Sequence, residues 1–285
     1  MDILKTITKY ANTSHRYYVG NRSDRRVLYK YMSIDSFKKC IGFPFHKKNQ
    51  SILFSEPSCW SDQFEKRFYL ADYSNLKVAT ASDTPRVYAC CFTYASNSDA
   101  AWKVYANKNL GLEGLCVKIK INRAKLSQEL LKWSKGKYNL YEGFVNYKLT
   151  AYNIFHLHEK YRIVVPPYSS QVPNSHFTKI FTNNFKLENY LSLLLLKRSE
   201  FDYEKEFRYF LIDNPSIANK NQDRIYPQIS WSNVIDEVDV DEQYPQSDFE
   251  NLQIYLEEYL KIDKSLIIKT DINAMPGGLI KIEKP

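Results

Sequence analysis

The sequence predicts an α+β fold, a single domain in which helices flank a mixed, mostly antiparallel β-sheet. Strand-like apolar runs occur between segments of helical period, and this arrangement is typical of α+β proteins. Aromatic residues make up 15% of the chain while glycine occurs only 8 times, which favours a packed, strand-containing domain. No internal repeat and no low-complexity linker divides the 285 residues.

Local patterns place the expected elements along the chain. Apolar or alternating runs predict strands at residues 27–32, 51–54, 86–93, 115–121, 141–147, 204–212 and 265–269, and a short strand within residues 231–240. Apolar side chains three and four positions apart predict helices at residues 2–11, 33–39, 98–106, 124–133, 187–197 and 248–259. Ser33 or Asp35 is suited to cap the second of these helices, and Ser98 begins the third. We therefore divide the chain into an appended N-terminal segment, residues 1–26, and one domain, residues 27–285.

Charge, cysteine usage and hydropathy limit the partners and the compartment. The formal net charge of +8 and the pI of about 9.0 favour a polyanionic partner such as nucleic acid. The five cysteines form no CxxC pair and fit no zinc spacing, so reduced thiols in a cytoplasmic protein are expected. No apolar run reaches the roughly 18 residues of a membrane span, and the N-terminus lacks a signal-peptide core, so no membrane partner is expected.

Common catalytic motifs are absent from the sequence. It contains no P-loop, GxGxxG, HExxH, GxSxG or CxxC, which removes the usual arguments for nucleotide kinases, dinucleotide folds, metalloproteases and hydrolases. His156 and His158 share a face only in a strand, and a partly exposed pair is a simpler interpretation than a metal site. Cys90 and Cys91 fit a buried strand better than a redox centre.

A charged stretch at residues 203–208, YEKEFR, precedes the apolar run YFLI. In a strand, the period of two puts Glu204, Glu206 and Arg208 on one face and mostly apolar residues on the other. The charged face is either an exposed ion-pair ladder of little energetic value or a rigid carboxylate site beside a polar ligand. Taken alone, the stretch favours the ladder.

Six segments occur in the order found in a bacterial family. They are YKY at residues 29–31, LFSEP at 53–57, WSDQFE at 60–65, CFT at 91–93, WKVYA at 102–106 with GLCV at 114–117, and YEKEFR at 203–208. In these segments the chain resembles the bacterial domain-of-unknown-function family 2971 over residues 27–212, which leaves residues 213–285 as a C-terminal extension. One departure is SDQ at residues 61–63, where the family usually has NDP, and this affects the local turn.

The same plan is similar, more weakly, to that of ADP-ribosyltransferases. This resemblance implies a split sheet and NAD as co-substrate, with one late-strand carboxylate that stabilises the oxocarbenium ion and a second that acts on the acceptor. Carried over, Glu206 is the catalytic carboxylate and Glu204 the acceptor-side residue. The resemblance implies Lys30 or Tyr31 and Ser55 as contacts to NAD, with Arg208 as a candidate for its phosphate. Trp102 and Tyr105 either stack on a ring of NAD or form an aromatic core pair at helical spacing. The first strand lacks the usual His or Arg, and Arg208 binds either a phosphate or Glu206.

Three functions follow as hypotheses. The first is an NAD-dependent ADP-ribosyltransferase-like effector, a toxin or phage-defence protein that modifies a nucleic acid or a protein. The second is a nucleic-acid-binding or processing protein, whose contacts are Arg16, Arg22, Arg25 and Arg26. The third is a non-catalytic interaction module that works with a regulatory protein subunit.

One spatial observation separates these hypotheses. A concave pocket lined together by Glu206, Ser55, Tyr31 and Trp102 favours the enzyme. A flat charged sheet favours the interaction module.

Overall fold

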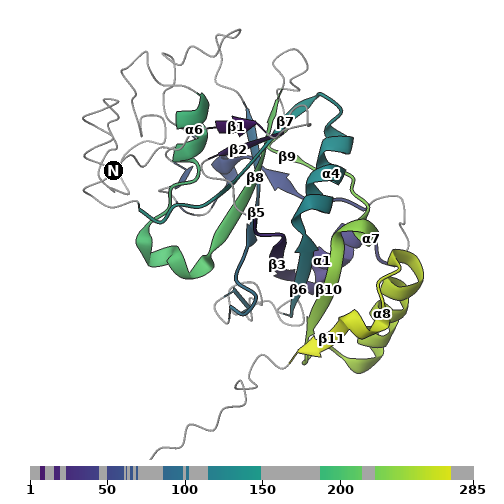
Figure 1. Ribbon diagram of the computed structural model, residues 1–285. Helices are drawn as coiled ribbons and strands as arrows, with labels where there is room; N and C mark the ends of the chain where they lie inside the picture. Colours follow the sequence, from purple (N-terminus) through teal and green to yellow (C-terminus); the bar gives the residue numbers. More distant parts are fainter. Residues whose placement is uncertain are drawn as a thin grey trace, which may run out of the picture.

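A computed structural model provides the fold. It describes residues 7–9, 16–19, 24–44, 50–60, 62, 65–66, 69, 86–98, 101–102, 115–148, 187–213 and 222–270. These residues build one 11-stranded mixed sheet with helices packed against it (Figure 1).

The elements follow one another along the chain as a mixture of strands and helices. The strands are β1 Ile7–Lys9, β2 Arg16–Val19, β3 Val27–Ser33, β4 Phe54–Ser55, β5 Val87–Thr93, β6 Cys116–Asn122, β7 Tyr138–Phe144, β8 Glu206–Asp213, β9 Arg224–Ile225, β10 Ile235–Asp241 and β11 Ile267–Thr270. The α-helices are α1 Ile34–Ile41, α4 Arg123–Ser134, α6 Leu187–Leu193, α7 Trp231–Val234 and α8 Gln246–Leu260. The 3₁₀-helices are η2 Pro57–Cys59, η4 Ser199–Glu204 and η5 Lys264–Leu266.

The strand order along the sheet is β1-β2-β7-β8-β5-β3-β6-β10-β11, with β4 paired to β5 and β9 to β4. Neighbouring strands are antiparallel except for β2 with β7 and β10 with β11, which are parallel. The predicted α+β class with a mixed, mostly antiparallel sheet is therefore confirmed.

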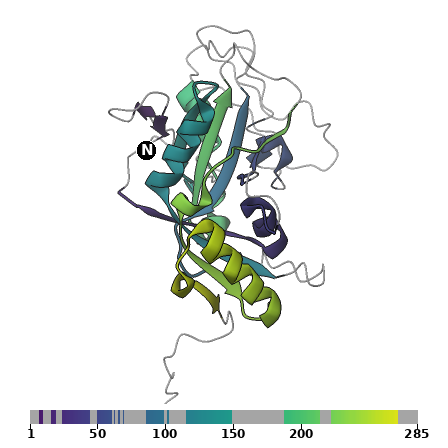
Figure 2. The same ribbon diagram turned by 90° about the vertical axis from the view of Figure 1, so that its right-hand side faces the viewer.

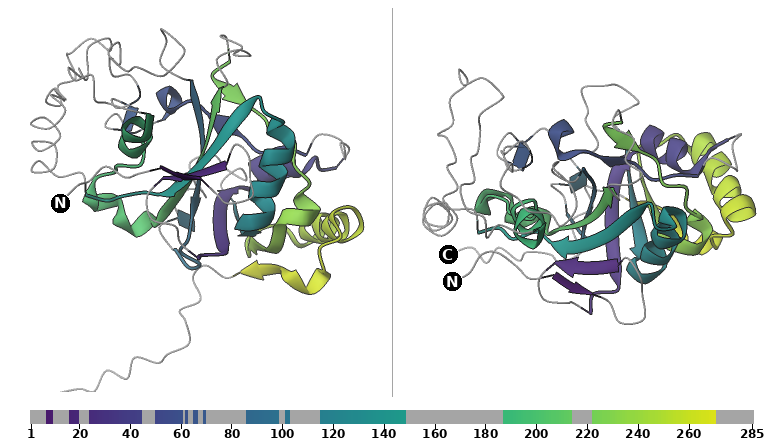
Figure 3. Two further views of the ribbon diagram at one scale, coloured as in Figure 1. Left: turned by 45° about the horizontal axis from the view of Figure 1, so that its top comes forward. Right: turned by 90° about the horizontal axis from the view of Figure 1, so that it is seen from above.

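Helices α1, α4, α7 and α8 pack on one face of the sheet, and α6 covers part of the other. Figure 2, in which α4 and α8 face the viewer, and the view from above in Figure 3 show this separation. The face beneath α4 buries Leu126 and Leu130 of the helix with Ile119 of β6. The opposite face buries Leu191 of α6 with Phe210 of β8. Strand β8 is buried along its whole length.

The local start signals of the helices act as predicted. Ser33 caps α1 by accepting a hydrogen bond from the Ser36 amide at 3.2 Å. The Ser98 hydroxyl likewise accepts from the Ala101 amide at 3.1 Å. Several predicted elements are present with ends shifted by at most two residues, namely those at residues 86–93, 115–121, 124–133, 204–212 and 248–259.

Other segments differ from the prediction. Residues 7–9 form strand β1 rather than part of a helix, because they pair antiparallel with β2. Residues 231–240 do carry the expected short strand, since β10 begins at Ile235, but residues 231–234 before it form helix α7. Of residues 51–54, only Phe54 lies in β4.

Both ends of the described chain contribute to the sheet. Strand β2, in the segment expected to be an appendage, pairs in parallel with β7 and buries Tyr18 and Val19. At the other end, β10 and β11 follow residue 212 and extend the same sheet beyond β6. Residues 16–19 and 235–241 are therefore integral strands.

The sheet opens between two of its central strands, β3 and β5. These neighbours share a single residue pair, Tyr29 with Thr93, whereas β3 and β6 pair along the whole of β3. Close by, the Lys30 ammonium group donates a hydrogen bond to the Cys91 carbonyl at 2.8 Å. A side chain thus satisfies a backbone acceptor of β5 where the pairing between the strands has ended.

Candidate functional site

A pocket of about 380 Å³ lies where the sheet opens. Its lining includes five aromatic side chains: Tyr29, Tyr31, Trp60, Phe92 and Tyr203. The lining also includes seven charged residues, Lys30 and Asp62 among them; the five that ion pairs join to one another form what we call the pocket cluster: Glu65, Lys197, Glu204, Glu206 and Arg208. The volume and the mixture of aromatic and polar groups are those of a small-molecule site.

Arg208 holds the catalytic candidate Glu206 in place. Its Nε donates to Glu206 Oε1 at 2.8 Å and its Nη2 to Oε2 at 2.9 Å, a bidentate pair on the same face of β8. The same Nη2 donates to Glu65 Oε2 at 2.7 Å, and Nη1 donates to the Leu194 carbonyl at 2.6 Å. The ring of Trp60 lies 4.4 Å from the guanidinium carbon. Arg208 is thus fully engaged with protein groups, and of the two alternatives left by the sequence, contact with Glu206 is the one observed.

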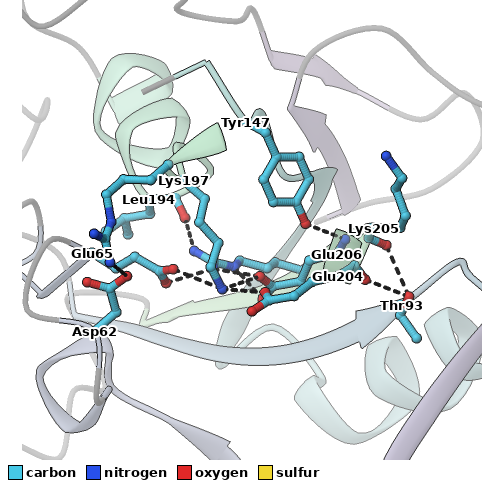
Figure 4. A network of polar contacts seen from close by, with 11 residues as sticks. Asp62, Glu65, Thr93, Tyr147, Leu194, Lys197, Glu204, Lys205 and Glu206 are labelled. Carbon is cyan, nitrogen blue, oxygen red and sulfur yellow. Dashed lines mark hydrogen bonds and ion pairs between the residues drawn. The ribbon is translucent and has the colours of Figure 1, made fainter. Parts of the chain in front are cut away.

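Lys197 joins three glutamates that come from separate parts of the chain. Its ammonium nitrogen lies 2.5 Å from Glu204 Oε2, 3.2 Å from Glu206 Oε2 and 3.1 Å from Glu65 Oε1. Figure 4 shows the amine pointing among these carboxylates. The pocket cluster is therefore one connected network.

Glu204 belongs to this network although it does not lie in strand β8. It ends the 3₁₀-helix η4, and strand β8 begins only at Glu206, so the expectation that Glu204 lies on the strand is wrong. Lys205 between them has φ of 45°, in the left-handed region, which breaks the alternation of side chains. The Thr93 hydroxyl stabilises this turn by donating to the Glu204 carbonyl at 2.7 Å.

The electrostatics of the pocket cluster keep Glu206 ionised. Burial alone raises the pKa of Glu206, but the charges of Arg208 and Lys197 outweigh burial and lower that pKa to about 2. Burial raises the pKa of Glu204, and Lys197 opposes this. Since three carboxylates face two cations, the pocket cluster carries one net negative charge when all are ionised. Such a site can stabilise positive charge that develops in a bound ligand.

Tyr31 and Trp102 lie together, but only one of them lines the pocket. The rings meet edge to face with centroids 5.5 Å apart, and Tyr31 belongs to the lining. Trp102 is 4% exposed and packs against Tyr31 in a small buried cluster. The Tyr31 hydroxyl donates to the Ser96 carbonyl at 3.1 Å. The joint cleft expected from four residues thus contains two of them, Glu206 and Tyr31.

Two other predicted NAD contacts have different positions. Ser55 lies on β4, where it pairs with Ala89 of β5 and with Arg224, and it is not part of the lining of this pocket. Lys30 lines the pocket while it donates to the Cys91 carbonyl. Tyr105 lies outside the described residues.

The arginines proposed for nucleic-acid binding have different surroundings in the described part of the chain. Arg16 pairs with the buried Glu142 at 3.0 Å, which neutralises its charge within the sheet. Arg25 lies over the ring of Tyr94 at 4.2 Å, and Arg26 is exposed. Arg22 lies outside the described residues.

No described helix has the length and hydropathy needed to cross a membrane.

Metal and thiol chemistry receive no support from the described residues. Among them, no three His, Cys, Asp or Glu side chains are grouped to hold a metal ion, and His156 and His158 lie outside them. Cys90 is buried in β5, and burial raises the pKa of the Cys90 and Cys91 thiols. Neither is activated as a nucleophile.

Trp60, Glu65 and Lys197 are among the site residues that were not predicted from the sequence. Trp60 and Glu65 lie in the segment WSDQFE, which was noted only as part of the family order. Lys197 directly follows the run LLLL, and the end of this apolar run was the only available signal. A lysine at such a point is more often a solvated helix end, so its contact with three glutamates depends on tertiary structure.

Comparisons with known proteins add no identification: no family model matches the chain, and neither a curated protein nor a solved structure matches it. The resemblances to family 2971 and to ADP-ribosyltransferases stay predictions from the segments quoted above.

Proposed function

We propose that the protein is an NAD-dependent ADP-ribosyltransferase-like enzyme whose pocket binds the nicotinamide and ribose end of NAD. The observation that carries this proposal is the pocket cluster, in which three glutamates contact two cations at the end of an aromatic-lined pocket. The proposed setting is a cytoplasmic effector, a toxin or phage-defence protein, whose acceptor is a nucleic acid or a protein.

The two glutamates have different roles in the proposed reaction. The bond between ribose C1′ and the nicotinamide nitrogen breaks, and nicotinamide leaves with the bonding electrons. Glu206, whose pKa is lowered to about 2, stabilises the positive charge that develops on the ribose. Glu204, whose pKa is raised by burial, accepts the proton of the acceptor as its nucleophile bonds to C1′.

The pocket residues fit the ring and ribose better than they fit the diphosphate. The nicotinamide ring of NAD is positively charged, so aromatic walls and a net negative end both favour it. The cations of the lining already have protein partners: Lys30 contacts the Cys91 carbonyl, and Lys197 and Arg208 contact glutamates. We therefore assign no diphosphate contact to these three cations.

Nicotinamide release tests the proposal. The full chain is incubated with NAD carrying a labelled nicotinamide, with and without cell lysate as a source of acceptor, and free nicotinamide is separated and counted. We expect Glu206→Gln to reduce release by about 100-fold or more, because it removes a charge that stabilises the transition state. Circular dichroism and thermal melting establish that the variant is folded.

A matched control is available on another part of the sheet. Glu237 also pairs with a lysine, Lys120, at 3.0 Å, but its side chain is 27% exposed, against 8% for Glu206, and it does not line the pocket. Glu237→Gln should leave nicotinamide release unchanged. Absence of release by the unmodified protein in every lysate would contradict the proposal, as would a folded Glu206→Gln variant of full activity.

A further inference from the structure

We propose that Lys197 is the positioning residue of this site, whose ammonium group draws Glu204 against Glu206 and sets the distance between the two carboxylates. The inference rests on the proposed function, because it assigns a role within the same reaction. Lys197 acts through the glutamates and is not itself assigned a contact with NAD or the acceptor.

The backbone around Lys197 is fixed by the sheet. The Lys197 amide donates to the Asn146 carbonyl at 3.0 Å, and the preceding Leu196 forms a parallel bridge with Asn146 just beyond β7. The ammonium nitrogen also lies 5.1 Å from the centre of the Phe201 ring, in η4. The side chain is 11% exposed. The backbone of Lys197 is therefore held by the sheet, and its ammonium group lies among the glutamates.

Lys197 and Arg208 differ in which glutamate depends on them for a cationic partner. Arg208 contacts both oxygens of Glu206, so Glu206 keeps a cation when Lys197 is removed. Glu204 differs, because among the described residues Lys197 is the one cation that a contact joins to it. Loss of Lys197 should therefore leave Glu204 without a cation against the repulsion of Glu206, while Glu206 stays in place beside Arg208.

This division predicts which half of the reaction depends on Lys197. Glu206 acts on bond cleavage, whereas Glu204 acts on the acceptor. Lys197→Met should lower transfer to the acceptor by about 100-fold, the usual contribution of a general base, and lower nicotinamide release in the absence of acceptor much less. Lys197→Arg, which keeps the charge, should recover most of the transfer.

The pH dependence gives a second readout that a purely structural role would not move. The groups that face Glu204 are Lys197, Glu206, Glu65 and the Tyr147 hydroxyl. Without the ammonium group, burial and the two neighbouring carboxylates raise the pKa of Glu204 further. The acidic limb of the transfer rate should therefore move to higher pH in Lys197→Met and return in Lys197→Arg.

A direct titration separates failure of this inference from failure of the proposed function. The Glu204 carboxyl is followed by NMR in protein labelled with ¹³C at the glutamate side-chain carboxyl, with Glu204→Gln to assign the signal. An upward shift in Lys197→Met that Lys197→Arg reverses supports the inference even if the protein releases no nicotinamide. An unchanged Glu204 titration overturns it.

Two further variants complete the experiment. Lys120→Met removes the lysine of the Lys120 and Glu237 pair outside the pocket and should change neither the titration of Glu204 nor the transfer rate. If Lys197→Met does not fold, Lys197→Gln replaces it, because glutamine keeps hydrogen-bond donors without the charge. Failure of both to fold would assign Lys197 to stability alone and overturn the inference.

Discussion

Two buried charge networks lie on neighbouring strands, and they differ in their surroundings and in their balance of charge. One is the pocket cluster. The other, which we call the sealed cluster, surrounds Glu142 of β7 and comprises Arg16, Arg123, Ser127, Glu142 and Tyr209. Glu142 pairs with Tyr209 across β7 and β8, one position along β8 from Arg208. The two networks therefore lie on opposite faces of the same part of the sheet.

The sealed cluster satisfies its carboxylate completely. Arg123 donates to Glu142 Oε1 at 2.8 Å, Arg16 donates to both oxygens, and the Ser127 hydroxyl donates to Oε2 at 3.2 Å. Two cations surround one carboxylate, and Glu142 is 0% exposed. The pocket cluster has the opposite balance, three carboxylates for two cations, and it borders a cavity. The charges of the sealed cluster therefore stabilise the fold, because the cations there fully pair the carboxylate. The pocket cluster instead has more carboxylates than cations, and it lies beside a cavity with room for a ligand.

The largest expected effect is on the sealed cluster. Glu142→Ala leaves Arg16 and Arg123 without their common partner and should lower the free energy of unfolding by about 3–5 kcal/mol. Urea denaturation at pH 7 measures this. Glu237→Ala, in a part-exposed pair, serves as the control and should cost less than about 1 kcal/mol. Equal losses in the two variants would show that the sealed cluster is not a structural centre.

The pocket cluster should make the stability of the protein depend on pH in the acid range. The folded-state pKa of Glu206 is lowered from 4.5 to about 2, so its stabilising contribution is present above pH 4.5 and is lost as the pH falls from 4.5 toward 2. Urea denaturation between pH 2.5 and 7 should show a decrease on the order of 3 kcal/mol from this group. Glu206→Gln should be less stable at pH 7 and lack this part of the pH dependence. An identical slope in the variant would contradict the ion-pair geometry.

A third carboxylate on these strands should behave in the opposite sense. Asp213, at the far end of β8, is 7% exposed, and burial together with Glu56 raises its pKa from 3.8 to about 6 despite Arg86. The ionised form is therefore unfavourable in the folded protein, and this cost appears as the pH rises from about 4 through 6. Asp213→Asn should raise the stability at pH 7 by about 1 kcal/mol and have little effect at pH 4. Thermal melting at both pH values checks this, and a loss of stability at pH 7 would contradict it.

Much of the fold could be predicted because its signals are local. The apolar runs of β5 and β6, the helical period of α4 and the cap at Ser33 each depend on residues a few positions apart. The period of two also placed Glu206 and Arg208 correctly on one face of β8. Where pairing partners decide the outcome, as for residues 7–9, the local pattern predicted a helix and the sheet imposed a strand.

The site could be predicted only in part, because register and chain path assemble it. Ser55 lies near the right strand, but its register places it opposite Ala89, while the pocket lies at Cys91 to Thr93. Glu204 approaches Glu206 through a left-handed turn at Lys205, which the strand pattern cannot express. Glu65 comes from 143 residues away along the chain to contact Arg208.

From the sequence alone we could predict the α+β class, most elements and the placement of Glu206 and Arg208 on one strand face, while the partner of Arg208 was left open. The sequence did not reveal that the sheet opens beside that face, that Lys197 and Glu65 contact the two residues, or that the network has more carboxylates than cations. The two kinds of feature depend on residues at different separations along the chain. Periodicity and capping act over a few residues, whereas a pocket requires side chains from distant segments whose positions depend on how the strands pair.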